Sequence, residues 1–413
     1  MKAVGVQTLQ LSRIGVERIG VVLLAAFVFF TMSALHLESR WLIQFNFEMI
    51  LFFAAALLYF PAFVWAEQDS TSLQGWMALV ALLAISPLLS SLANHQNLKV
   101  FYHSEYRSWV KALLLFPLVP WVCRKARGRS SVVDALLAGI FIFCLIVQYR
   151  FHVLGEMRLL DDRPKVNVKN GDPNFICVLA AVAIPFAIYR WRQAEKWRFL
   201  YLAVLALLAY TAVITESRMG VFSIGAGLAV SVAFAPKGLR RAAAWVLGLL
   251  LLSTLFLGDT VGRFRSLSDA SNHQRWRSIQ TGLQLSQEKP FFGFGWGESS
   301  KHFYRVTGHD RLMSEATPLA VHNTPLQLWG ELGIFGLFAF TALILGTLGA
   351  ALPAARRGDP LGVAALSALT ILCLNLLTLP LKSKDFVILY VAIILAVSLP
   401  LEGKTPEKGV PVC

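Results

Sequence analysis

Charged residues are scarce in this 413-residue chain. Asp, Glu, Lys and Arg make up 15% of it and hydrophobic residues 56%, whereas soluble domains carry about 25% charged residues. Apolar runs of roughly 17–25 residues recur along the chain, and each is long enough to cross a bilayer. We therefore expect an all-α polytopic membrane protein, and no soluble domain is evident.

Paired cysteines and grouped acidic residues are also lacking. The five cysteines form no CxxC pair, and none lies in the single long polar segment at 259–323. The acidic residues of that segment are scattered, so neither a disulfide framework nor a zinc site is expected. The spaced glycines of 290–297 follow no strand, which excludes a dinucleotide fingerprint and favours a packed turn. The cysteines are Cys123, Cys144, Cys177, Cys373 and Cys413.

The apolar runs predict about twelve transmembrane helices. They lie at 19–35, 47–66, 75–93, 108–123, 132–150, 173–190, 198–214, 219–235, 242–258, 325–350, 361–380 and 385–401. The basic residues before the first run would also suit a signal peptide, but the many spans that follow favour a retained first helix.

Lys and Arg in the short loops set the orientation. With a cytoplasmic N-terminus, four basic clusters fall on the cytoplasmic side. This arrangement divides the chain into nine spans over 1–258, a long periplasmic loop over 259–324, and three spans with a short cytoplasmic tail over 325–413. We expect the protein to reside in the bacterial inner membrane, with both termini cytoplasmic. The clusters are Arg124/Lys125/Arg127/Arg129, Arg190/Arg192/Lys196/Arg198, Lys237/Arg240/Arg241 and Arg356/Arg357.

Arg218 is the most unusual base on the predicted outer face. It lies in a hairpin too short to leave the membrane surface, and an arginine there needs an anionic partner. A functional role competes with an ion pair to Glu216 or snorkelling to headgroups.

Further bases gather in two outer segments. Guanidinium groups match the geometry of a diphosphate with bidentate contacts, so a lipid-linked diphosphate is a natural ligand. The alternative is that these bases solvate the loops or bind anionic lipid. The nearby aromatic residues, Trp276 and Trp296 among them, either stack on sugars or lie at the membrane interface. The candidate substrate-binding residues are Arg158, Arg163, Lys169, Arg265, Arg277, Trp296 and Lys301, with Arg263 and His302 as further rivals in the long loop.

His322 is the candidate base. We place Thr324 as the N-cap and Pro325 in the first turn of the helix that follows, so His322 lies at the boundary of loop and membrane. An imidazole with a pKa near 6.5 accepts a proton from a hydroxyl at neutral pH. The alternative is an ordinary surface histidine. Glu331 lies within the next span, where a carboxylate needs a partner. We expect it to orient another polar helix and not to pair with His322.

These residues together resemble the O-antigen ligase and polymerase superfamily over the second half of the chain. His322 precedes an apolar helix with the step Glu331-Leu332-Gly333. Arg275 is followed by the turn Pro290-x-x-Gly293-x-Gly295-x-Gly297, and Ser217-Arg218-Met219-Gly220 and Pro173-Asn174 resemble two further family motifs. Gln274 and Ile279 depart from the family's usual glycine and aromatic residue, which makes Arg277 a rival of Arg275.

The resemblance implies a metal-independent glycosyltransferase of the multispanning GT-C type, without a cofactor. Such enzymes move a glycan from undecaprenyl diphosphate to an acceptor at the periplasmic face. His322 would then be the base, and Arg218 and Arg275 would stabilise the departing diphosphate. Asn174, Gly293, Gly295, Glu331 and Gly333 would be structural residues of the motifs.

The sequence leaves the acceptor open. One dominant outer loop and a short tail favour a ligase, whose acceptor is lipid A–core oligosaccharide. A polymerase, which joins lipid-linked repeats, and a protein-directed transferase are alternatives. From another class, a lipid-linked glycan transporter is an alternative, but transporters usually show paired broken helices and inverted repeats, which the sequence does not indicate. Membrane lipids are expected partners and nucleic acid is not.

Overall fold

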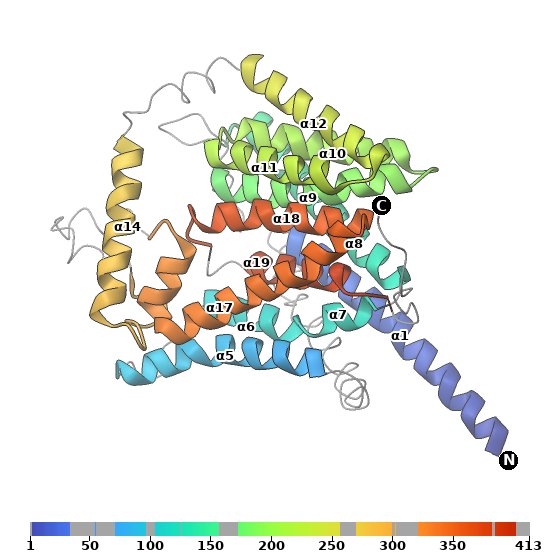
Figure 1. Ribbon diagram of the computed structural model, residues 1–413, viewed down its shortest axis with the longest axis horizontal. Helices are drawn as coiled ribbons and strands as arrows, with labels where there is room; N and C mark the ends of the chain where they lie inside the picture. Colours follow the sequence, from blue (N-terminus) through green and yellow to red (C-terminus); the bar gives the residue numbers. More distant parts are fainter. Residues whose placement is uncertain are drawn as a thin grey trace.

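The computed structural model describes most of the chain as a bundle of α-helices (Figure 1). Every regular element among the described residues is helical, which confirms the all-α prediction. The described residues are 2–33, 54, 71–95, 104–124, 126–156, 172–256, 270–299, 302, 321–381 and 385–401. The helices are α1 (Lys2–Ser33), α5 (Thr71–Ala93), α6 (Ser104–Leu115), α7 (Leu118–Val122), α8 (Ala126–His152), α9 (Pro173–Gln193), α10 (Arg198–Ile214), α11 (Arg218–Phe234), α12 (Lys237–Phe256), α14 (Ala270–Glu288), α17 (Thr324–Arg356), α18 (Pro360–Leu376) and α19 (Asp385–Ser398).

Four of the described helices are long and apolar enough to cross a membrane, and five shorter apolar helices accompany them. The chain is therefore a helical membrane protein, while the number of twelve spans stays a prediction. The predicted span at 47–66 lies, apart from residue 54, outside the described residues. The four long segments are Gly75–Ala93, Arg127–His152, Pro173–Gln193 and Thr324–Arg356.

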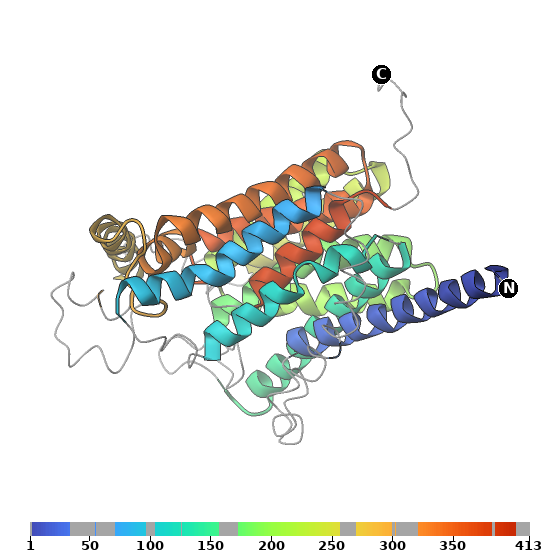
Figure 2. The ribbon, with the colours of Figure 1, turned by 90° about the horizontal axis from the view of Figure 1, so that it is seen from below.

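Residues 108–123, which the sequence predicts to form one span, do not form a single helix. The structure has α6 and α7 there, with a break at Phe116 and Pro117. Proline has no amide hydrogen to donate within a helix, and its ring clashes with the preceding turn. The first helix also begins at Lys2 and not at 19, and its N-terminal half projects beyond the bundle (Figure 2).

Small and polar residues let the central helices approach closely. A Cβ on Gly227 of α11 would lie 2.5 Å from Cγ1 of Ile371 on α18. The hydroxyls of Ser231 and Ser367 lie 2.7 Å apart across the same pair of helices. Side-chain packing and interhelical hydrogen bonds drive association where lipid removes the hydrophobic force between helices. Every residue of α19 is buried, so this helix lies at the core of the bundle.

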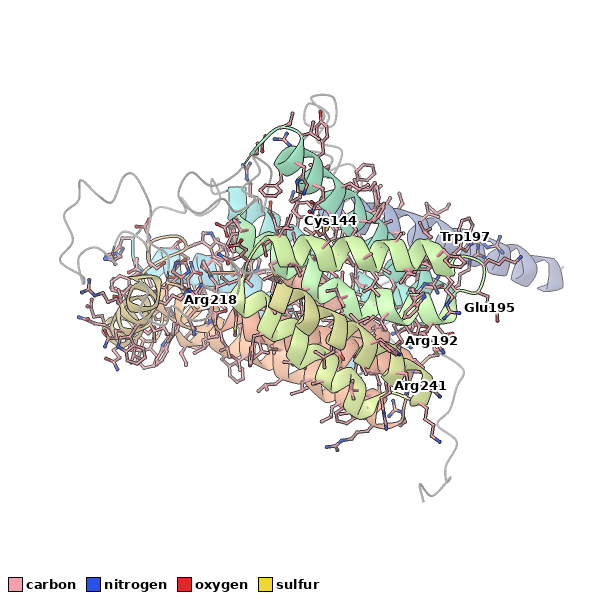
Figure 3. The ribbon with its side chains drawn as sticks, turned by 90° about the horizontal axis from the view of Figure 1, so that it is seen from above. Cys144, Arg192, Glu195, Trp197, Arg218 and Arg241 are labelled. Atoms are coloured by element: carbon pink, nitrogen blue, oxygen red, sulfur yellow. The ribbon has the colours of Figure 1, made fainter. Side chains whose placement is uncertain are left out.

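The two ends of the bundle carry different residues. Figure 3 shows Arg218 at one end and Arg192, Glu195, Trp197 and Arg241 at the other. A Cβ on Gly238 would meet Nη2 of Arg192 at 2.9 Å, so two of the predicted cytoplasmic clusters lie together. The bundle thus separates these two clusters from the candidate site, as expected if they face opposite sides of a membrane.

Helix α17 is broken near its start, and a turn fills the break. Gly333 has φ 71° and ψ −168° inside the helix. Backbone N–H groups of Phe294 and Gly295 donate to the carbonyls of Gly330 and Glu331, at 2.8 and 3.0 Å. The N–H of Ile334 donates to the carbonyl of Pro290 at 2.8 Å. The turn that follows α14 therefore supplies the hydrogen bonds that the break removes.

Glu331, a residue of α17, holds this turn in place through hydrogen bonds. It is 1% exposed, and its carboxylate accepts hydrogen bonds from the N–H of Gly297 and the hydroxyl of Ser299. A buried carboxylate is costly unless it is hydrogen-bonded. We expected Glu331 to orient another polar helix, but these partners lie in the turn after α14.

Candidate active site

His322 lies directly before α17, as predicted, but a different residue caps the helix. The Asn323 side chain accepts from the N–H of Leu326 at 3.0 Å, so Asn323 is the N-cap and the assignment of Thr324 is wrong. The Thr324 hydroxyl donates to the carbonyl of Leu379 at 2.6 Å and accepts from the N–H of Leu381 at 2.9 Å. Both residue types cap helices well, and the tertiary bond to the segment after α18 decides between them.

The His322 ring makes no hydrogen bond to any of the described residues. Its Nδ1 is buried and has no hydrogen-bond partner there. Burial lowers the pKa of the imidazole below 6.5, the nearby charge of Arg275 lowers it further, and Asp172 opposes them. The ring is therefore neutral at neutral pH, with lone-pair capacity free for a substrate proton.

Arg275 and Arg218 lie near one another in the same region. Arg275 is in the second turn of α14, and Arg218 is the first residue of α11. The pKa of Arg275 is lowered, first by desolvation of its guanidinium among protein atoms and then by the positive charge of Arg218, although Arg275 as a whole is an exposed residue of α14. Two guanidinium groups close enough for one to lower the pKa of the other have the charge and the donors that suit an anion.

Asn174 and Asp172 join the start of α9 to this site. Asp172 is the N-cap of α9 and accepts from the N–H of Asn174 at 2.9 Å. The Asn174 Oδ1 accepts from the hydroxyl of Ser217, the N-cap of α11, at 3.2 Å. The predicted structural role of Asn174 fits this contact. Sequence reasoning assigned no role to Asp172, although its charge acts on His322.

The glycines of the turn are required by its backbone. Gly293 and Gly295 have φ 66° and 111°, a region that disfavours other residues. A Cβ on Gly333 would lie 1.9 Å from the carbonyl oxygen of Phe291. The packed turn predicted from the sequence is confirmed.

Trp296 is 2% exposed, so the structure places it in the core. Its ring lies 4.9 Å from that of Trp109 and 5.7 Å from that of Tyr106. This contact fixes the turn against α6. By contrast, Trp276 on α14 is 60% exposed.

The remaining candidates are only partly described. Arg277 is exposed on α14, and the His302 ring packs 4.2 Å from that of Phe294. Five predicted binding residues and Arg263 lie outside the described residues. The five are Arg158, Arg163, Lys169, Arg265 and Lys301. No group of three or more His, Cys, Asp or Glu that could hold a metal occurs in the described part of the chain.

Fold and site together define a helical membrane protein with an imidazole and two guanidinium groups gathered at one end of its bundle. Residues 203–341 match the family described as O-antigen ligase, a segment that includes Arg218, Arg275 and His322. This match supports membership of the O-antigen ligase/polymerase superfamily, a group of glycosyltransferase-like enzymes that act on lipid-linked glycans. No curated protein matches it.

Proposed function

We propose that this protein is an O-antigen ligase of the GT-C type. It transfers a glycan from undecaprenyl diphosphate to lipid A–core oligosaccharide at the periplasmic face of the inner membrane. The donor diphosphate lies against Arg218 and Arg275, and the acceptor hydroxyl faces His322.

One observation carries this proposal. A neutral imidazole without a ring partner among the described residues lies within electrostatic range of Arg275, and Arg275 lies within range of Arg218. The three side chains come from the start of α17, from α14 and from the start of α11. A base next to an anion site is the arrangement that a displacement of diphosphate by a hydroxyl needs. The positive charges act on the leaving group, so no general acid and no metal ion are required by the proposed step.

The step is a single displacement. The acceptor hydroxyl oxygen bonds to the anomeric carbon of the donor while the bond from that carbon to the diphosphate oxygen breaks. The hydroxyl proton passes to His322, and the electron pair of the broken bond leaves with undecaprenyl diphosphate. Arg218 and Arg275 stabilise the negative charge that grows on the diphosphate. One displacement inverts the anomeric centre.

The dominant 259–324 segment favours the ligase over a polymerase, since the other outer segment, 151–172, is much shorter. The two activities use the same donor but different acceptors. Their chemistry at His322 is the same, so the acceptor has to be established by experiment.

Deletion of the gene tests the assignment. The lipopolysaccharide and the lipid-linked glycan pool of the deletion strain would be compared with those of the parent. Core without O-antigen, together with polymer accumulated on undecaprenyl diphosphate, supports the ligase. Core capped with one repeat supports the polymerase. An unchanged ladder removes both and leaves a transporter or a protein-directed transferase.

Complementation separates enzyme from transporter. The deletion strain receives either the parent gene or the His322→Ala variant, with both proteins quantified in the membrane. The ligase requires that only the parent gene restores O-antigen. A transporter that makes no glycosidic bond has no need of this imidazole.

A further inference from the structure

One face of α14 packs directly on the residues around His322. Arg275, Ser278 and Gly282 are three and four residues apart, so they lie on the same side of the helix. A Cβ on Gly282 would lie 2.7 Å from Cγ1 of Val321 and 3.2 Å from Cβ of Leu326. The glycine allows α14 to approach the start of α17 more closely than any larger residue would.

Ser278 makes the polar contact of this face. It is 1% exposed, and its hydroxyl oxygen accepts a hydrogen bond of 2.7 Å from the backbone N–H of His322. His322 precedes the first residue of α17, so its N–H belongs to no helical ladder. Ser278 therefore satisfies a donor that the local backbone leaves free, across 44 positions of sequence.

We infer that Ser278 is a positioning residue for the transfer reaction, because it ties the backbone of His322 to the helix that carries Arg275. The inference rests on the proposed function. The proton acceptor and the diphosphate site come from different elements, and the hydrogen bond through Ser278 joins them beside the close packing at Gly282. Ser278 contacts no substrate in this role.

Kinetics of the full-length protein in liposomes test the role. Ser278→Ala removes the acceptor, and we expect kcat to fall by about 10- to 100-fold, the loss that follows a displacement of about 1 Å in a reacting group. The KM for the undecaprenyl-diphosphate-linked donor should change by about twofold at most, because Arg218 and Arg275 keep their side chains. Ser278→Thr retains the hydroxyl and should restore most of kcat.

Ser286→Ala is the matched control. Ser286 is buried on the same helix, but its hydroxyl donates to the Gly282 carbonyl at 2.7 Å within that helix. This variant removes an equally buried hydroxyl and should keep the parental kcat. Ser278→Cys keeps the side-chain volume with a weak acceptor and gives an intermediate loss, which guards against a misfolded alanine variant.

A double variant distinguishes positioning from general support of the fold. If Ser278 acts through His322, His322→Ala/Ser278→Ala is no slower than His322→Ala alone. Additive losses, or a parental kcat in Ser278→Ala, would overturn the inference.

Amide hydrogen exchange across 321–324 gives a readout that needs no activity. The His322 amide should exchange faster in Ser278→Ala and not in Ser286→Ala; equal exchange in the two variants contradicts the tether. If the parent protein transfers no glycan while this difference remains, the proposed function fails and the tether stands. If the parent transfers glycan and Ser278→Ala is indistinguishable from it, only the positioning role fails.

Discussion

At the scale of single residues, His322 carries the first prediction. His322→Ala removes the proton acceptor, and we expect transfer to fall by at least about 100-fold while the protein still reaches the membrane. Transfer is measured on a gel with purified protein, extracted donor and core acceptor.

His95→Asn is the control for that loss. His95 is an exposed histidine just after α5, with φ 53°, a conformation that asparagine tolerates. Its neighbour Asn94 donates to the Gly293 carbonyl at 2.9 Å, so both lie beside the turn after α14. Near-parental transfer by His322→Ala would remove the imidazole from the mechanism.

The lowered pKa of His322 predicts a pH profile. The imidazole acts as a base only when neutral, and burial and Arg275 hold its pKa below 6.5. Transfer should therefore be constant above pH 6.5 and fall as the pH drops through the lowered pKa. The measurement is kcat/KM against pH for the free enzyme. An activity loss centred above pH 6.5 would mean that the pKa of the base is raised, which contradicts the lowering expected from burial and Arg275.

Substitution of Arg275 by lysine separates the contribution of its charge from that of its planar guanidinium. Arg275→Lys keeps a positive charge but loses the planar fork that contacts two phosphate oxygens. We expect kcat to fall by about 100-fold in Arg275→Ala and by less in Arg275→Lys. Equal activity of Arg275→Lys and parent would show that charge alone suffices, and unchanged activity in both variants would exclude the residue.

At the scale of elements, the break in α17 depends on Gly333. A Cβ there would lie 1.9 Å from the Phe291 carbonyl oxygen, and the backbone has φ 71°. We expect Gly333→Ala to destabilise the protein by about 1–3 kcal/mol for the strained backbone alone. The substitution should also lower the rate of glycan transfer, because the turn after α14 no longer packs against α17. Thermal unfolding in detergent measures the first effect.

Gly349→Ala is the control in the same helix. Nothing lies within 4 Å of a Cβ at Gly349. Alanine is favoured over glycine in a helix by about 0.5–1 kcal/mol, so this variant should unfold at the same temperature or higher. If both variants unfold alike, the turn does not depend on the break.

The sequence singles out individual residues but not the contacts between them. His322, Arg218 and Arg275 stand out because ionisable groups are rare in a membrane protein and need a reason. Ser278 and Asp172 do not stand out, because the first contacts His322 across 44 positions of sequence and the second acts on it from the start of α9. Hydrophobic periodicity carries no information about either interaction.

The same limit applies to whole elements. The apolar run at 325–350 predicts a helix, and α17 is one, but the break at Gly333 exists because a distant turn binds there. Likewise Asn323 and Thr324 are both good N-caps, and the segment after α18 takes the Thr324 hydroxyl. Local sequence predicts the type of element, and tertiary contacts decide how it begins and where it bends.

At the scale of the whole molecule, the separation of the two ends predicts which residues face the periplasm. Gln287 is exposed on α14, the helix that carries Arg275, and Glu195 is exposed at the end opposite Arg218 (Figure 3). With the outer membrane permeabilised, a membrane-impermeant maleimide should label Gln287→Cys in intact cells and Glu195→Cys only after lysis. The parent protein controls for its own cysteines, of which Cys123, Cys144 and Cys177 are buried. Labelling of Glu195→Cys alone in intact cells would invert the protein and move the site to the cytoplasm, where a periplasmic acceptor could not reach His322.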